Sequence, residues 1–346
     1  MTSTNSTAKA SGSYDDVTFV HALRRMGLAQ PNEVIDLTPL TGGVSSDIRL
    51  VQIGARRFCA KRALAQLRVA QNWQVDTSRN AAEAAYFRTV RAWVPGFVPE
   101  LLGEDAEAGL FAMVYLDPDT HPLWKANLLR GESDASFAAQ VGTALARVHS
   151  KSASAPGLHA AFDNDALFEA LRLDPYLRAT SARHPALASR LQSLADTTRD
   201  THLALVHGDV SPKNILAGPN GPILLDAECA WFGDPAFDIA FCLNHLLLKG
   251  ARAGQRRALY APAFEAFVDA YLQGVDWEPR SALERRAAAL LPALLLARID
   301  GKSPVEYLTG EVEQNAVRAF AMPRVATPPQ RLQNVIDDWV QGDPAT

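Results

Sequence analysis

The residue types best suited to chemistry lie in two short segments of the C-terminal half of the chain. Residues 205–216 read LVHGDVSPKNIL, and residues 223–228 read ILLDAE. They contain the carboxylates of Asp209, Asp226 and Glu228 and the carboxamide of Asn214, each near a short apolar run. Oxygen donors of this kind bind Mg²⁺, and a polyphosphate can approach several carboxylates only when such hard cations lie between them. The pattern therefore predicts a Mg²⁺-dependent phosphoryl-transfer site.

The spacing of these residues supports that interpretation. Asp209 precedes Asn214 by five residues, so one loop can present a base to a substrate hydroxyl and a ligand to a metal ion. Each residue also has an ordinary structural interpretation, in which His-Gly-Asp is a tight turn, Asn214 a cap and Asp226 the end of a strand. Turn chemistry accounts for any one residue but poorly for both segments together.

The two segments resemble those of the aminoglycoside phosphotransferase and choline kinase-like family, whose members share the protein-kinase fold and whose catalytic loop begins His-Gly-Asp. The resemblance implies that Asp209 is the catalytic aspartate and that Asn214 and Asp226 bind Mg²⁺. Glu228 matches the second acid of the D-x-E pattern of methylthioribose kinases, where it also approaches the metal ion. ATP and Mg²⁺ are therefore the expected cosubstrate and cofactor.

Two further residues are expected to support the catalytic loop without taking part in chemistry. His207 is interpreted as a histidine that braces the loop. Residues 232–240, FGDPAFDIA, resemble the family segment that follows the metal-binding loop, and the resemblance implies that Asp238 braces the catalytic loop.

A kinase fold also requires phosphate-binding elements near the N-terminus. Residues 34–40 and 48–53 are predicted strands, joined by a turn in which Gly42, Gly43 and Ser45 supply backbone and hydroxyl donors for phosphate. Lys61 lies in the next predicted strand, 57–62, among apolar residues, where an ammonium group needs an anionic partner. We interpret Lys61 as the phosphate lysine; the alternative is a solvated charge on an edge strand.

The next elements are a helix and two strands. Residues 78–93 have a helical apolar spacing, and Glu83 on that helix is expected to pair with Lys61, although a solvated glutamate near the helix N-terminus is the alternative. Residues 98–103 and 110–116 are predicted strands. The resemblance implies that backbone groups of Val114 and Leu116 contact the adenine base, whereas an ordinary strand fits the same residues.

Helical patterns dominate from about residue 120 onward, over 136–150, 165–177, 185–200, 237–249, 261–274 and 281–299. Strands first and helices afterwards predict an α+β protein with the bilobal protein-kinase-like fold. The expected divisions are a flexible tail over 1–13, an antiparallel nucleotide-binding lobe over 14–116 and a mainly helical catalytic lobe over 117–346.

Charge, composition and motifs argue against a nucleic-acid-binding protein, a membrane protein and a zinc protein. The net charge of −4 provides no basic footprint for nucleic acid. The longest apolar stretch, 287–297, is too short for a bilayer and contains Pro292, so we predict a buried helix and no membrane partner. Three cysteines without a C-x-x-C pair are consistent with the cytoplasm, and scattered histidines give no zinc motif.

The leading hypothesis is a small-molecule kinase that transfers the γ-phosphoryl group of ATP to a hydroxyl of a sugar, an amino alcohol or an aminoglycoside-like acceptor. A nucleotide-binding regulatory pseudokinase is the alternative, and a protein kinase is disfavoured by the His-Gly-Asp loop and the lack of an A-P-E-like segment. Residues 124–129 and 298–303 are polar segments that could contact the acceptor. The helices carry mixed charge, which slightly favours a neutral or zwitterionic metabolite over a polycationic drug.

Overall fold

The computed structural model describes residues 14–40, 46–64 and 79–342, and these residues form two compact units. Of these residues, the first unit contains 14–40, 46–64, 79–81 and 101–115, and the second contains 82–100 and 116–342. The predicted tail, 1–13, and the predicted phosphate turn with Gly42, Gly43 and Ser45 lie outside the described residues.

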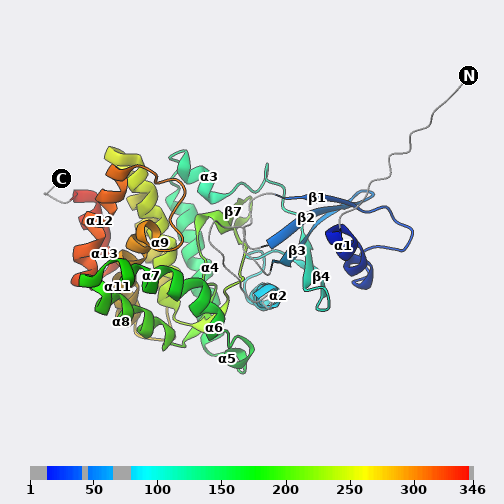
Figure 1. Ribbon diagram of the computed structural model, residues 1–346, viewed down its shortest axis with the longest axis horizontal. Helices are drawn as coiled ribbons and strands as arrows, with labels where there is room; N and C mark the ends of the chain where they lie inside the picture. The colour runs from blue at the N-terminus through cyan, green and yellow to red at the C-terminus, as the bar shows by residue number, and fades with distance from the viewer. Residues whose placement is uncertain (1–13, 41–45, 65–78, 343–346) are drawn as a thin grey trace, which may run out of the picture. The chain divides into compact units, whose positions relative to one another are not determined.

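The first unit is built on a five-stranded antiparallel sheet in the order β1-β2-β3-β5-β4 (Figure 1). Its elements are α1 (Tyr14–Arg25), β1 (Asp36–Pro39), β2 (Ser46–Ile53), β3 (Arg56–Ala63), β4 (Leu101–Asp105) and β5 (Leu110–Val114). Phe19 and Leu23 of α1 pack with Val51, Phe58 and Ala112 of the sheet to form its core. The strands expected from the sequence are confirmed, whereas α1 was not predicted.

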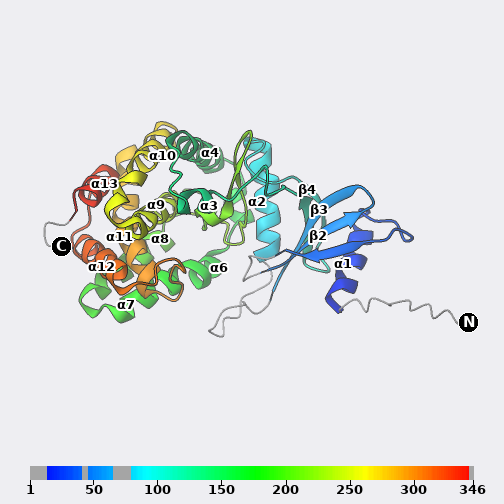
Figure 2. The same cartoon turned by 90° about the horizontal axis from the view of Figure 1, so that it is seen from above.

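The second unit is mainly helical, as expected (Figure 2). Its α-helices are α2 (Arg79–Trp93, mostly in this unit), α3 (Trp124–Leu129), α4 (Ala135–Ala153), α5 (Leu158–Ala161), α6 (Asp165–Phe168), α7 (Ala179–Arg183), α8 (Ala188–Arg199), α9 (Pro235–Ala253), α10 (Ala261–Gln273), α11 (Arg280–Asp300), α12 (Glu311–Ala326) and α13 (Leu332–Gln341). The π-helix η1 covers Glu169–Arg178, and short 3₁₀ helices cover η2 (Pro185–Leu187), η3 (Pro212–Asn214) and η4 (Gly254–Tyr260). The α+β fold class is thereby confirmed.

Two short antiparallel strand pairs flank the candidate catalytic segment. Strand β6 (Ala204–Val206) pairs with β9 (Trp231–Gly233), and β7 (Ile215–Gly218) pairs with β8 (Gly221–Leu224). Because β6 and β7 are held by different partners, the residues between them form a loop with both ends tied down.

Helix α9 is the central helix of the second unit. Every residue from Pro235 to Ala251 is buried, and α11 packs along α9. Helix α11 is itself buried from Ala287 to Asp300 except for one position, and it contains Pro292. The prediction of a buried helix over 287–297 is therefore confirmed, and none of the helices in the described part of the chain could span a membrane.

The helix predicted over 165–177 differs from the one observed. After one turn of α6 the chain continues as the π-helix η1, with Pro175 inside it. Proline has no backbone N–H and clashes with the preceding turn, so it disfavours regular α-helical hydrogen bonding at this point. The helices α12 and α13 were also not expected from the sequence.

The unit boundary also differs from the one expected at residues 116 and 117. Residues 82–100, assigned from the sequence to the N-terminal lobe, belong to the second compact unit. The ring of Tyr86 packs edge-on against His207, and Leu224 N donates a hydrogen bond to Phe97 O at 2.7 Å. These contacts explain why the segment clusters with the catalytic loop.

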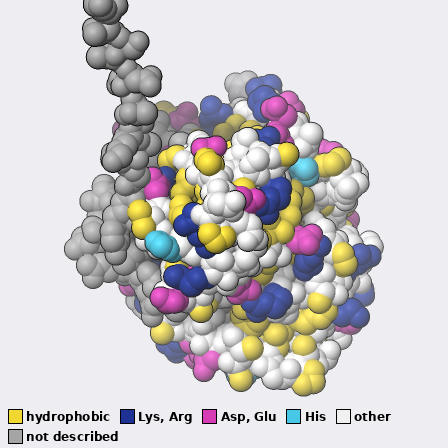
Figure 3. All heavy atoms as spheres, turned by 90° about the vertical axis from the view of Figure 1, so that its right-hand side faces the viewer, with side chains coloured by type: hydrophobic (Ala, Val, Ile, Leu, Met, Phe, Trp, Pro, Cys, Tyr) yellow, Lys and Arg dark blue, Asp and Glu magenta, His cyan; other side chains and the backbone are white. Residues whose placement is uncertain are grey.

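The surface shown in Figure 3 carries lysine and arginine side chains interspersed with acidic and apolar ones. This face therefore lacks the continuous basic stripe with which proteins bind the nucleic-acid backbone. The three cysteines are buried free thiols.

Candidate active site

The loop between β6 and β7 has a backbone conformation that requires glycine. Gly208 has a φ of 79°, and a Cβ atom at this position would lie 2.9 Å from both Cβ and O of Cys229. A side chain would therefore be strained by the backbone and would collide with its neighbour. This explains why a glycine lies between His207 and Asp209.

Asp238 holds this loop from α9. Its carboxylate accepts hydrogen bonds from the backbone N–H groups of His207 and Gly208, each at 2.8 Å. His149 Nε2 lies 3.3 Å from the same carboxylate, and His149 Nδ1 lies 2.6 Å from the hydroxyl of Tyr271. Asp238 and His149 have no solvent exposure, so the loop is anchored inside the core of the second unit.

The side chain of His207 connects the two candidate segments. Its Nε2 lies 3.1 Å from Leu225 O, and its Nδ1 accepts a hydrogen bond from Asp209 N at 3.1 Å. A neutral imidazole with its proton on Nε2 satisfies both contacts. Burial lowers the pKa of His207 despite the nearby charges of Asp238, Asp209 and Asp226, which favours this neutral form.

Asp209 is a buried carboxylate whose two oxygens differ. Its Oδ2 forms ion pairs with Arg172 Nη2 at 3.0 Å and with Lys213 Nζ at 3.1 Å. Its Oδ1 is buried without a hydrogen-bond partner among the described residues. Burial alone raises the pKa of Asp209, but the charges of Lys213 and Arg172 outweigh it and hold the pKa well below its ordinary value. The carboxylate is therefore ionised at neutral pH, and only one of its two oxygens is engaged by cations of the described residues.

Arg172 fixes both the loop backbone and Asp209. In addition to the ion pair, Arg172 donates from Nε to Gly208 O and from Nη1 to Leu171 O, the latter at 2.8 Å. Its guanidinium group lies 5.8 Å from the ring centroid of Phe241. Planar, multidentate contacts of this kind orient a carboxylate more tightly than a lysine could.

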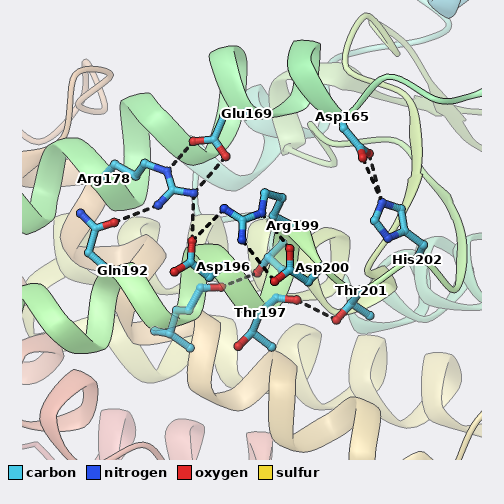
Figure 4. Close-up of polar contacts among 12 residues, drawn as sticks. Asp165, Glu169, Arg178, Gln192, Asp196, Thr197, Arg199, Asp200, Thr201 and His202 are labelled. Carbon is cyan, nitrogen blue, oxygen red and sulfur yellow. Dashed lines mark hydrogen bonds and ion pairs between the residues drawn. The ribbon is translucent and has the colours of Figure 1, made fainter.

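The π-helix that carries Arg172 is itself anchored to α8. Figure 4 shows Arg178, at the end of η1, between Glu169 of the same helix and the side chains of Gln192 and Asp196. Arg178 Nη1 donates to Gln192 Oε1 at 2.8 Å, and Arg178 Nη2 donates to Asp196 Oδ1 at 3.2 Å. This network restrains η1, and with it the position of Arg172.

The predicted metal ligands come together through the backbone. Asn214 Nδ2 donates to Asp209 O at 3.1 Å, and Leu225 N donates to Asn214 O at 2.8 Å, so the strand end before Asp226 is tied to the catalytic loop. Asp226 has a φ of 65°, a left-handed conformation that is uncommon for residues other than glycine and concentrates at functional sites. Glu228 is buried and interacts electrostatically with Arg172.

This donor set fits Mg²⁺ in the manner of a phosphoryl-transfer site. Across the described ranges, no cluster of three or more histidine, cysteine or acidic side chains is arranged as a metal site. Mg²⁺ usually takes one or two protein carboxylates together with phosphate and water oxygens, so it does not need such a cluster.

The residues predicted to bind the nucleotide lie in both units. Lys61, on β3 between β2 and β5, is 2% exposed, so the alternative of a solvated edge-strand lysine is wrong. Glu83 on α2 is 1% exposed, so the alternative of a solvated glutamate is also wrong. Val114 ends β5 opposite Phe58, and Leu116 follows the strand. The Lys61–Glu83 pair and the adenine contacts stay predictions.

Sequence reasoning did not assign a role to Arg172, Lys213 or His149. Lys213 had a detectable signal, because it lies four residues after Asp209 within the same loop. Arg172 and His149 had none, since they lie 37 and 60 residues before Asp209 in the chain. Only the packing of η1 and α4 brings them to the catalytic loop.

Comparison with known proteins identifies the group to which these features belong. The family model described as "Phosphotransferase enzyme family" matches residues 36–283. A methylthioribose kinase from Pectobacterium atrosepticum is 27% identical over 259 residues, which cover 64% of this chain and 62% of that protein. The match thus spans less than two thirds of that relative's length.

Solved structures show the same fold at low sequence identity. An ethanolamine kinase from Plasmodium vivax aligns with a TM-score of 0.57 and 12% identity, covering 90% of this chain and 89% of that chain. A choline kinase from Streptococcus pneumoniae aligns with a TM-score of 0.51 and 16% identity, covering 91% and 100%. The resemblance inferred from the catalytic and metal segments is confirmed.

Proposed function

Because the chain belongs to the phosphotransferase enzyme family, we propose that it is an ATP- and Mg²⁺-dependent kinase that phosphorylates a hydroxyl of a small molecule. The observation that carries this proposal is the state of Asp209, a buried and ionised carboxylate with one oxygen held by two cations and the other without a partner among the described residues. That arrangement suits the orientation of an attacking hydroxyl group.

In the proposed reaction the acceptor hydroxyl donates a hydrogen bond to Oδ1 of Asp209. The hydroxyl oxygen attacks the γ-phosphorus of ATP, the bond from that phosphorus to the β,γ-bridging oxygen breaks, and ADP leaves with the electron pair. Asp209 is a weak base because Lys213 and Arg172 stabilise its charged form. It therefore orients the hydroxyl early and accepts the proton late, when bond formation has made the proton acidic.

The remaining predicted residues are assigned to ATP and its metal ion. Asn214 and Asp226, with Glu228 as an additional acid, would hold Mg²⁺, which neutralises charge on the phosphate oxygens when bound. Lys61, oriented by Glu83, is assigned to the phosphates, and backbone groups of Val114 and Leu116 to the adenine. Gly42, Gly43 and Ser45 are the proposed phosphate-covering turn.

A coupled ADP-release assay tests the proposed function. The full chain is supplied with ATP and Mg²⁺ and a panel of sugars, amino alcohols and aminoglycosides. ADP release that depends on an acceptor supports the kinase. Binding of ATP without turnover on any acceptor would favour the regulatory module, and phosphorylation of generic proteins would favour a protein kinase.

Metal removal is expected to abolish turnover. Chelation with excess EDTA should reduce ADP release to background, because the charge on the phosphate oxygens is no longer neutralised. Added Mg²⁺ should restore ADP release.

Asn214→Ala should raise the Mg²⁺ concentration needed for half-maximal rate by roughly tenfold or more. Asn220→Ala, in the turn between β7 and β8, is the matched control and should keep the normal Mg²⁺ dependence. Full activity in EDTA would contradict the metal assignment.

Arg172→Met is expected to lower kcat by about tenfold to hundredfold, because Asp209 loses its multidentate partner. The substitution should also shift the acidic limb of the pH–rate profile to higher pH, because one of the charges that lower the pKa of Asp209 is removed. Steady-state kinetics from the lowest pH at which both proteins stay folded up to pH 9 measure both effects. Arg190→Met, an exposed arginine on α8, is the control. A variant with lower kcat but an unmoved acidic limb would show that Arg172 only supports the fold.

A further inference from the structure

The C-terminal half of α9 contains a buried lysine without a carboxylate partner. Lys249 is 2% exposed, and its Nζ lies 3.4 Å from His245 O and 4.9 Å from the ring centroid of Tyr307. Within the described ranges, Lys249 forms no ion pair; the neighbouring acid, Glu306, is paired with Lys125. A buried ammonium group that contacts only a carbonyl oxygen and an aromatic ring is not compensated for its lost hydration.

Lys249 lines a cavity that is rich in cations. The cavity has a volume of about 500 Å³, and its lining includes Arg130, Lys249, Arg252 and Arg256, with Glu313 as the acidic member. Arg130 is paired with Glu132, whereas Arg252 and Arg256 form no ion pair in the part of the chain that the structure describes. We name this cavity the Lys249 pocket. Its volume suits a small ligand, and its charge suits an anion.

Two further buried polar atoms without partners in the described ranges belong to residues that interact electrostatically with Lys249. Arg298 is 7% exposed and donates to the hydroxyl of Tyr176 at 3.1 Å, yet its Nε has no partner among the described residues. The same holds for Nε2 of His245. Buried polar atoms without partners are rare in proteins and often mark an absent ligand or water.

His245 is in electrostatic contact with both sets of groups. It interacts with Lys249 and Arg298, and also with Asp209 and Lys213 of the catalytic loop. His245 and Lys249 lie one turn apart on α9, on the helix whose Asp238 holds the catalytic loop. His245 therefore lies within electrostatic reach of both Asp209 and the ammonium group of Lys249.

The charge balance at Lys249 supports an anionic ligand. Burial lowers the pKa of Lys249 to about 7, with Lys125 and Arg298 acting in the same direction and Cys242 and Glu306 acting against it. A bound anion would restore the charged form, so binding and protonation must be coupled. Binding should therefore weaken as the pH rises through about 7.

We propose that the Lys249 pocket binds a phosphate or carboxylate group of the acceptor, which makes the acceptor a negatively charged hydroxyl compound. This inference rests on the proposed kinase function for the identity of the ligand, but not for the existence of the anion site. It departs from the neutral or zwitterionic acceptor that the mixed charge of the helices favoured.

Sulfate is the first probe, because its charge does not change between pH 6 and pH 8. Calorimetric titration at constant ionic strength should show binding to the full chain that is about tenfold weaker at pH 8 than at pH 6. Lys249→Met should abolish it, and Arg252→Gln, at an exposed position, should weaken it. Lys151→Met, an exposed lysine of α4, should bind sulfate normally. Absence of binding, or equal binding by Lys249→Met, would overturn the anion site.

Turnover then identifies the source of the anion. Matched pairs of neutral and phosphorylated or carboxylated polyols are compared as acceptors in the ADP-release assay. We expect the anionic member to be preferred, sulfate to compete with it, and Lys249→Met to raise its KM by about tenfold to hundredfold with little change in kcat. Preference for the neutral member would overturn the acceptor assignment and leave the kinase function standing. Sulfate binding through Lys249 without acceptor competition, or with no turnover, would instead assign the pocket to a free anion.

Discussion

Asp209→Asn is expected to lower kcat for acceptor phosphorylation by two to four orders of magnitude, about the range that positioned acid–base groups contribute. The amide keeps the shape of the side chain but cannot accept the proton, and it attracts the hydroxyl proton more weakly than a carboxylate. The measurement is acceptor-dependent ADP release, with ATP binding followed separately. Since Asp209 is assigned to the acceptor and not to the nucleotide, the affinity for ATP should change little.

The matched control is Asp163→Asn, at an exposed aspartate of the same unit, which should keep the normal kcat. Retention of more than about a tenth of the normal kcat by Asp209→Asn would remove Asp209 from the reaction. A folding defect is a separate outcome and is checked by the melting temperature, because the substitution leaves Arg172 and Lys213 without their shared anion.

The pH dependence follows from the depressed pKa of Asp209. Ionised Asp209 stabilises the fold above its unfolded-state pKa of about 4, and this stabilisation is lost only as the pH falls through the lower folded-state pKa. The acidic limb of kcat that Asp209 controls should accordingly lie well below pH 4. It is measured over the pH range in which the protein stays folded.

Asp238→Ala is expected to destabilise the protein by about 3–5 kcal/mol, because it removes a buried acceptor that several hydrogen bonds share. It leaves the N–H groups of His207 and Gly208 without their acceptor, and each unsatisfied buried donor costs about 1–3 kcal/mol. The melting temperature, measured by calorimetry, should fall by on the order of 10 °C. Activity should fall with it, because the loop that carries Asp209 is no longer anchored.

Asp269→Ala, at an exposed position of α10, is the control and should change the free energy of unfolding by less than about 0.5 kcal/mol. Asp238→Asn keeps one carbonyl oxygen as an acceptor, so its melting temperature should lie between those of Asp238→Ala and Asp269→Ala. A melting temperature for Asp238→Ala that matches the control would mean that other contacts hold the loop, contrary to the geometry described above.

The sequence by itself determined the class of fold and the proposed catalytic segments, because both depend on local patterns. Short apolar runs bounded by turn residues predicted the five strands, and helical spacing predicted most of the helices after residue 120. The H-G-D-x-x-x-x-N loop and the L-L-D-x-E strand end are contiguous, so their chemistry could be read without knowing how the chain folds. The role of Asp238 came from the resemblance of residues 232–240 to the family segment, which is also continuous in the chain.

Only the tertiary structure decided how these residues are held and charged. The ionised state of Asp209 depends on Arg172, which is carried by the π-helix η1, and that helix is anchored to α8. The buried state of Lys61 depends on β3 being a central strand. Lys249, the central residue of the proposed anion site, is buried because α9 packs against α11 and because the ring of Tyr307 lies over its ammonium group. Long-range packing sets the hydration and the electrostatic neighbours of a side chain, and neither leaves a periodic trace in the sequence.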